Sequence, residues 1–231
     1  MFQRETATDP KIVDEWEEGF GWFAHPDEPG QRASYAFSFD DGVWLVDPLD
    51  AAGIGERIDT LGTVVGVTVC SSWHARDADV FATRYDVPIS IHESMRRIEA
   101  ITESPIRRYG STLETAGVRV FDRHPFRLAD EAILYHDRTG TLYVPDTLGT
   151  TPDHTVGDER VGFEPFSRRF PPTELLDLEP SRICCGHGEP VTEDATAALE
   201  EAITNGRRRF FRALVQNGPG RVRTAIAAIR G

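Results

Sequence analysis

One stretch of sequence decides the fold, and it reads VTVCSSWHARDAD over residues 67–79. It starts within a run of β-branched and apolar residues, 63–70, which is typical of a fully buried strand. Ser71 and Ser72 give a helix-start signal, and 78–85 is compatible with a helix. A buried strand that leads through a polar turn into a helix places its last side chains at the carboxyl edge of a sheet, where ligand sites of α/β proteins lie. Four chemically capable side chains occupy this turn: Ser72, His74, Arg76 and Asp77.

The composition predicts one domain that spans residues 1–231. No Ser/Gly-rich or Pro-rich linker divides the chain, and 39% hydrophobic residues suit a sizeable buried core. No apolar run approaches the roughly 20 residues of a membrane helix, and residues 1–9 lack the apolar centre of a secretion signal. We therefore expect a cytoplasmic protein without a membrane partner. The three cysteines are odd in number and have no C-x-x-C spacing, which argues against a disulfide framework or a cysteine zinc site.

The charge excludes one class of partner. The net charge is −13, and such a field repels the phosphates of nucleic acids, so no nucleic-acid partner is expected. Lys11 is the only lysine among 25 basic residues. An acidic, arginine-rich composition is typical of a salt-adapted cytoplasm, because carboxylates hold water well and concentrated salt screens their mutual repulsion.

Salt adaptation predicts a higher melting temperature in molar potassium chloride than in dilute buffer. The physical reason is that screening removes more repulsion from the compact folded state than from the expanded unfolded chain. Thermal unfolding at both salt concentrations checks this expectation. Equal melting temperatures would contradict it.

Alternating strands and helices predict an α/β (α+β) protein, in which two packed sheets carry helices on their outer faces. Residues 149–172 are rich in Gly, Pro and Thr and are expected to form a long surface loop near the site. Helices are expected from about residue 192, with helical packing that continues after Asn205-Gly206. A break is expected at Gly218-Pro219-Gly220, before a closing amphipathic helix whose apolar face lies over 222–229. The predicted strands are 34–39, 43–46, 63–70, 87–92, 117–121, 132–135, 141–144 and 181–185. The other predicted helices are 51–61, 78–85, 95–101 and 173–178.

Ionisable side chains follow four of the predicted strands. A single histidine at a strand end is usually structural, but strand ends of one sheet edge converge in space, so four of them together indicate a site. The residues at these ends are His74 with Asp77, His124, Asp146 and His187.

These elements resemble the metallo-β-lactamase superfamily in their order. The resemblance rests on the hairpin that closes at Asp47, the strand that leads to His74, the stretch Leu142 to Asp146, and Cys185-Gly186-His187-Gly188. It covers roughly residues 34–203. It implies an αββα four-layer sandwich and a hydrolase-like activity, since the superfamily includes lactamases, thioesterases of the glyoxalase II type and lactonases.

The first motif departs from the superfamily pattern His-x-His-x-Asp-His. This chain has Ser72-Trp73-His74-Ala75-Arg76-Asp77 there, and only His74 keeps its type. Ser72 stands in place of the first zinc-ligand His, Arg76 in place of the Asp that ligates the second metal, and Asp77 in place of the last His.

The later motifs match the superfamily pattern more closely than the first one does. Asp146 resembles the bridging Asp of the superfamily and His187 its final His, while His124 lies where the middle His is expected. The permanent charge of Arg76 would occupy the place of the second of two cations that lie roughly 3.5 Å apart. We therefore predict that the usual dinuclear zinc site is lost and that Arg76 pairs with Asp146 or Asp77.

Two functions remain open. In the first, one zinc or iron ion activates water against an ester, thioester or amide, with Asp77 as general base and Arg76 as holder of an anionic substrate or oxyanion. The candidate ligands are His74, His124, Asp146 and His187. In the second, the protein holds no metal and is a non-catalytic binder of a small anionic ligand, or an interaction protein, that uses the inherited cleft. A homo-oligomer formed through Phe210, Phe211 and the last helix is compatible with both.

Overall fold

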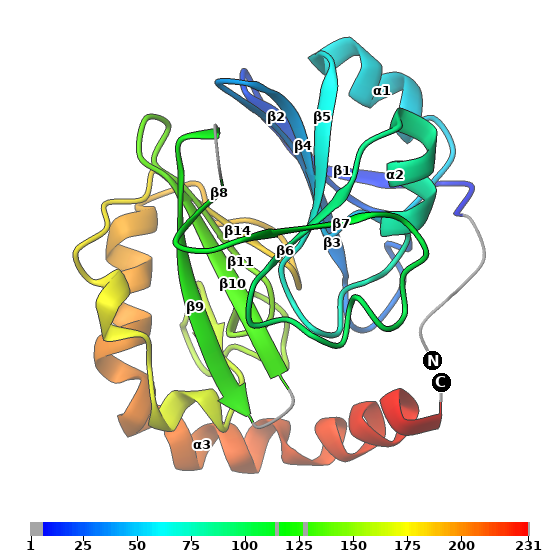
Figure 1. Cartoon of the computed structure of the whole chain (residues 1–231). Coiled ribbons are helices and arrows are strands. Elements are labelled where there is room, and N and C mark those ends of the chain that lie inside the picture. Colours follow the sequence, from blue (N-terminus) through cyan, green and yellow to red (C-terminus); the bar gives the residue numbers. More distant parts are fainter. Residues whose placement is uncertain (1–6, 114–115, 127–128, 231) are drawn as a thin grey trace.

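Two sheets pack face to face in the computed structural model, which describes residues 7–113, 116–126 and 129–230 (Figure 1). The first sheet has the strand order β1 (Lys11–Trp16), β2 (Gly19–Phe23), β3 (Ala33–Phe39), β4 (Gly42–Val46), β5 (Val64–Val69), β6 (Ile89–His92) and β7 (Ile106–Tyr109). The second has the order β14 (Arg182–Cys185), β11 (Thr141–Val144), β10 (Ala129–His136), β9 (Val118–Phe126) and β8 (Thr112–Leu113).

The strand directions explain where polar side chains gather. From β1 to β4 neighbouring strands are antiparallel, as expected for hairpins, and from β4 to β7 they are parallel. In the second sheet β11 and β14 are parallel. Parallel neighbours end at the same edge of their sheet, so the residues that follow β4 and β5 lie together, as do those that follow β11 and β14.

Helices cover the outer face of each sheet (Figure 1). The helices α1 (Ile54–Leu61) and α2 (Ala78–Tyr85) form the crossovers between parallel strands and share a buried cluster with the first sheet, while α3 (Ala195–Arg230) packs on the second. Side chains alternate in β10, where Leu134 faces the first cluster and Ile133 faces the cluster under α3. The predicted αββα sandwich is confirmed.

The C-terminal segment is one helix, so the break expected at Gly218-Pro219-Gly220 was wrong. Gly206 lies inside this helix and packs closely against a neighbour, because a Cβ atom there would lie 3.4 Å from the Phe163 ring. The apolar face expected over 222–229 lies outside the residues whose side chains are described.

The segment 149–172 is not the surface loop that its composition indicates. It contains a small ladder between β12 (Leu148–Gly149) and β13 (Gly162–Phe163) and the short 3₁₀ helix η2 (Ser167–Arg169). Arg168 is 0% exposed and forms an ion pair with buried Glu159 at 2.6 Å. The segment is ordered by this pair, which composition does not reveal.

Other differences are local. The strands β1 and β2 were not predicted, and 95–101 forms turns rather than a helix. The helix expected at 173–178 is reduced to the 3₁₀ helix η3 (Thr173–Leu175). No helix among the described residues combines the length and the apolar character needed to cross a membrane.

Candidate metal centre

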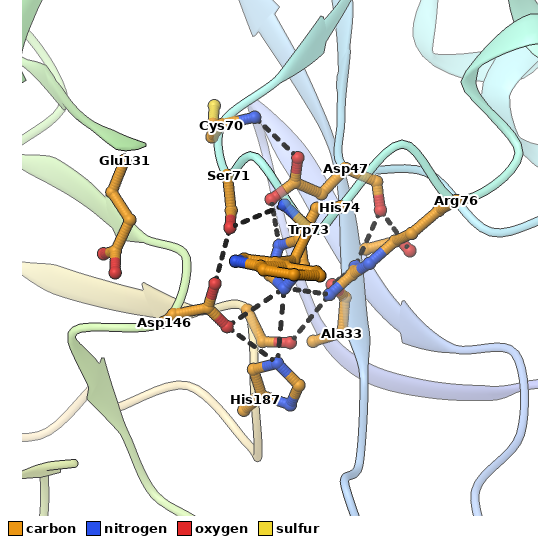
Figure 2. Close-up of polar contacts among 12 residues, drawn as sticks. Ala33, Asp47, Cys70, Ser71, Trp73, His74, Arg76, Glu131, Asp146 and His187 are labelled. Atoms are coloured by element: carbon orange, nitrogen blue, oxygen red, sulfur yellow. Dashed lines mark hydrogen bonds and ion pairs between the residues drawn. The ribbon is translucent and has the colours of Figure 1, made fainter. Parts of the chain in front are cut away.

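Three of the predicted ligands meet between the sheets. His74 lies in the turn after β5, Asp146 follows β11, and His187 follows β14 (Figure 2). The Nε2 atoms of both imidazoles lie 3.1 Å from Asp146 Oδ1 and 3.3 Å from each other. Within the described part of the chain, this is the one group of three or more His, Cys, Asp or Glu residues whose ligand atoms all lie within 4.8 Å.

The outer nitrogens of both rings are fixed by hydrogen-bond acceptors. His74 Nδ1 donates to Asp47 Oδ2 at 2.8 Å, and His187 Nδ1 donates to the Gly30 carbonyl at 2.7 Å. A carbonyl or a carboxylate only accepts, so each Nδ1 carries a proton, and the lone pair of each neutral ring lies on Nε2. Both Nε2 atoms therefore present an electron pair toward Asp146, an arrangement that is typical of histidines that bind a metal.

Asp47 orients this centre and was not among the predicted site residues. It follows β4, is fully buried, and has a positive φ of 46°. Besides His74, its carboxylate accepts the backbone N–H of Cys70 at 2.7 Å and the hydroxyl of Tyr143 at 2.5 Å. In the sequence, Asp47 is marked by its place at the end of a buried strand and by the hairpin that closes on it, which contributes to the resemblance to the metallo-β-lactamase superfamily.

Arg76 lies beside the centre but not in the predicted ion pair. Its guanidinium donates to the carbonyls of Ala33, Asp47 and Gly186 at 2.5, 2.8 and 3.2 Å. The expected pairing with Asp146 or Asp77 was wrong, because these three strand-end carbonyls converge on the guanidinium. One terminal nitrogen of Arg76 still lies 3.5 Å from His74 Nε2, so the positive charge faces the centre (Figure 2).

Two predicted site residues lie outside this group. Asp77 precedes α2, and its carboxylate accepts the backbone N–H of Asp50 at 2.7 Å. The side chain of His124 is 54% exposed and lies between Asp122 and Asp130, at 2.9 and 2.8 Å. The structure therefore brings together His74, Asp146 and His187, but it does not bring Asp77 or His124 to them.

The charges at the centre shift the pKa values of His74 and Asp146. Burial and the guanidinium of Arg76 lower the pKa of His74, but the carboxylates of Asp146 and Asp47 outweigh them, and the net shift is upward. Burial alone would raise the pKa of Asp146, but the imidazoles of His74 and His187 hold it well below its usual range. The centre thus keeps an ionised carboxylate and attracts positive charge.

The buried carboxyl group of Glu131 lies near Asp146 and, like Asp47, was not among the site residues predicted from the sequence. Burial, and next the charge of Asp146, raise the pKa of Glu131 to about 8, while its Oε2 accepts the backbone N–H of Thr147 at 2.9 Å. Figure 2 shows Glu131 on the Asp146 side of the group. The second oxygen of Asp146 accepts the Ser71 hydroxyl at 2.6 Å. No sequence motif marks Glu131, which lies within β10.

Comparison with known structures defines the fold. The chain is similar to the DIM-1 metallo-β-lactamase, with a TM-score of 0.60 and 13% identity over 87% of this chain and 99% of that one. It is also similar to a metallo-β-lactamase from Pontibacter korlensis, with a TM-score of 0.59 and 12% identity over 85% of this chain and 100% of that one. For the protein TTHA1623, solved in a di-iron-bound form, the TM-score is 0.53 and the identity 16%, over 74% of this chain and 94% of that one. No protein-family model and no curated protein matches the sequence.

These likenesses, together with the two sheets and the outer helices, identify the class: the chain has the metallo-β-lactamase fold. The fold expected from the order of the sequence elements is thereby confirmed. His74, Asp146 and His187 form its candidate metal centre.

Proposed function

We propose that this protein is a hydrolase that binds one zinc or iron ion through His74, Asp146 and His187. The observation that carries the proposal is the convergence of two imidazole Nε2 atoms and one carboxylate oxygen within 3.3 Å, with both outer nitrogens tied to acceptors. Three electron-rich atoms at such distances repel one another unless a cation or a proton lies between them.

The set of donors fits zinc or iron. Two imidazoles and one carboxylate suit both ions, and three protein ligands leave a position open for a reactant, as catalytic sites require. The di-iron form belongs to TTHA1623, and it supports iron as a candidate here beside zinc. A bound divalent cation would supply Lewis acidity toward a carbonyl group and toward water.

Arg76 supplies a fixed positive charge to the reaction. Its guanidinium is anchored by three backbone carbonyls, so no carboxylate neutralises it among its described contacts, and one nitrogen faces the centre. A donor held in this way binds the carboxylate of a small substrate or the oxyanion that forms during attack on an ester, thioester or amide. The same charge favours one cation in the centre rather than two.

Glu131 holds a proton near the reacting groups. With its pKa raised to about 8, this carboxyl group is protonated at neutral pH, so it can donate a proton to a leaving group. This is a general-acid role and differs from the general-base role expected of Asp77, whose carboxylate accepts the backbone N–H of Asp50.

A metal-free binder of a small anion is the second candidate. The specific observation in its favour is Arg76 Nε, which is buried and has no hydrogen-bond partner. An anion that reaches this guanidinium would satisfy that atom and neutralise the charge. Metal content after reconstitution separates the two candidates, because only the hydrolase needs a cation.

Hydrolysis of simple acyl compounds by the reconstituted protein tests the proposal. With zinc or iron added, we expect turnover of a nitrophenyl ester or an acyl thioester that falls at least about 100-fold in His187→Ala, since loss of one of three ligands empties the centre. His124→Ala is the matched control and should stay within about twofold, because His124 lies outside the group. Turnover by the metal-free protein or by His187→Ala that equals that of the reconstituted wild type would contradict the proposal.

A further inference from the structure

A third imidazole lies against the candidate metal centre, from a segment that carries no recognised motif. His154 lies between β12 and β13, is 7% exposed, and stacks on His187 with the ring centroids 6.0 Å apart and the planes inclined by 23°. Its Nε2 lies 3.2 Å from the backbone carbonyl of Asp146. It therefore touches two of the three proposed ligands at once.

The hydrogen bonds of His154 define what it can do. The Asp146 carbonyl only accepts, so His154 Nε2 carries a proton and donates it there. In the neutral ring Nδ1 is then an acceptor, and it lies 2.8 Å from the Thr151 hydroxyl, which donates to it. Because both nitrogens are engaged, this ring offers no lone pair to a cation. Its geometry suits it to holding the ligands in place.

The surroundings of His154 are closely packed and hydrogen-bonded. A Cβ atom on Gly149 would lie 2.7 Å from the imidazole, so the ring is packed directly against that backbone. The His154 carbonyl accepts from Arg168, whose guanidinium is fully buried and bonds Glu159 at 2.7 and 2.6 Å. Glu159 in turn bonds Arg209 of α3 at 3.1 Å. A continuous chain of contacts thus joins α3 to the ring.

We infer that His154 is a positioning residue of the cation site. It fixes the Asp146 backbone by a hydrogen bond and the ring plane of His187 by stacking, and thereby keeps Asp146 Oδ1 and His187 Nε2 at a distance that one cation can bridge. Outer contacts of this kind change metal affinity by about 10- to 100-fold in proteins. The inference rests on the proposed function, in which the three residues bind a cation.

Zinc affinity of the metal-free full-length protein, measured by competition with a chromophoric chelator, tests the inference. His154→Phe keeps a flat ring but loses both hydrogen bonds, and we expect its dissociation constant for zinc to rise about 10- to 100-fold. His154→Gln places an amide N–H near the position of Nε2 and should recover most of the affinity. A merely structural role would lower the unfolding midpoint of the metal-free protein without this recovery by Gln.

His136→Phe is the matched control. His136 is also a buried histidine whose Nδ1 lies near a threonine hydroxyl, that of Thr139 at 2.9 Å, but it packs on Phe39 away from the centre. Its zinc affinity should equal that of the wild type.

The outcomes separate this inference from the proposed function. If the wild type binds no zinc, the proposed function fails and the inference falls with it. If the wild type binds zinc and both His154 variants bind it equally well, the inference alone is overturned. Should His154→Phe not fold, Thr151→Val removes the donor to Nδ1 and leaves the ring. Its affinity should fall by severalfold, and an unchanged affinity would also overturn the inference.

Discussion

Replacing Arg168 with alanine is expected to lower the free energy of unfolding by about 3–5 kcal/mol, because it leaves a buried carboxylate without its main partner. Arg168 is 0% exposed and donates to both oxygens of Glu159 and to the carbonyls of His154 and Phe163. Arg209 is the only other cation that bonds Glu159 among the described residues, and it reaches a single oxygen of that carboxylate. Equilibrium unfolding in urea measures the change.

The exposed pair of Arg119 and Asp137 provides the comparison. It is also bidentate, at 2.8 and 2.7 Å, but both side chains are about half exposed. Arg119→Ala should therefore cost at most about 1 kcal/mol, as surface pairs do. If both substitutions cost the same, burial is not what makes the Arg168 pair important, and the account of segment 149–172 is wrong.

Replacing Glu131 with glutamine is expected to remove a pH dependence of stability in the metal-free protein. The pKa of Glu131 is raised to about 8 from an ordinary value of 4.5, so the folded state keeps a proton that the unfolded state has released. The wild type therefore loses stability as the pH rises from about 4.5 to 8, and the loss levels off above that range. It amounts to a few kcal/mol, since one pKa unit is worth about 1.4 kcal/mol.

Urea unfolding at pH 5, 7 and 9 with chelator present checks this prediction. The stability of Glu131→Gln relative to the wild type should increase from pH 5 to pH 9, because glutamine has no proton to lose. A difference between the two proteins that is constant across this range would show that Glu131 ionises normally in the folded state.

The sequence predicted the part of the centre that strand order determines. Asp146 and His187 follow the parallel neighbours β11 and β14, which end at the same edge, while His74 lies in the turn after β5 of the facing sheet. The same reasoning does not hold for His124, because this residue does not follow a strand. The strand β9 extends from Val118 to Phe126, so His124 lies within it and its side chain is held by Asp122 and Asp130.

The remaining site residues depend on contacts that a sequence does not express. Arg76 binds backbone carbonyls, and any residue type supplies a carbonyl, so no pattern identifies its partners. Glu131 and His154 come from a strand interior and from an irregular segment, respectively. Their roles follow from burial and distance, which appear only once the two sheets are packed.

Anomalous diffraction from crystals of the zinc-reconstituted protein tests the central claim most directly. The account predicts one zinc peak, about 2.0–2.2 Å from His74 Nε2, His187 Nε2 and Asp146 Oδ1, with Arg76 still bound to its three carbonyls. Two peaks roughly 3.5 Å apart with the guanidinium displaced would contradict it, and so would no peak between these three side chains.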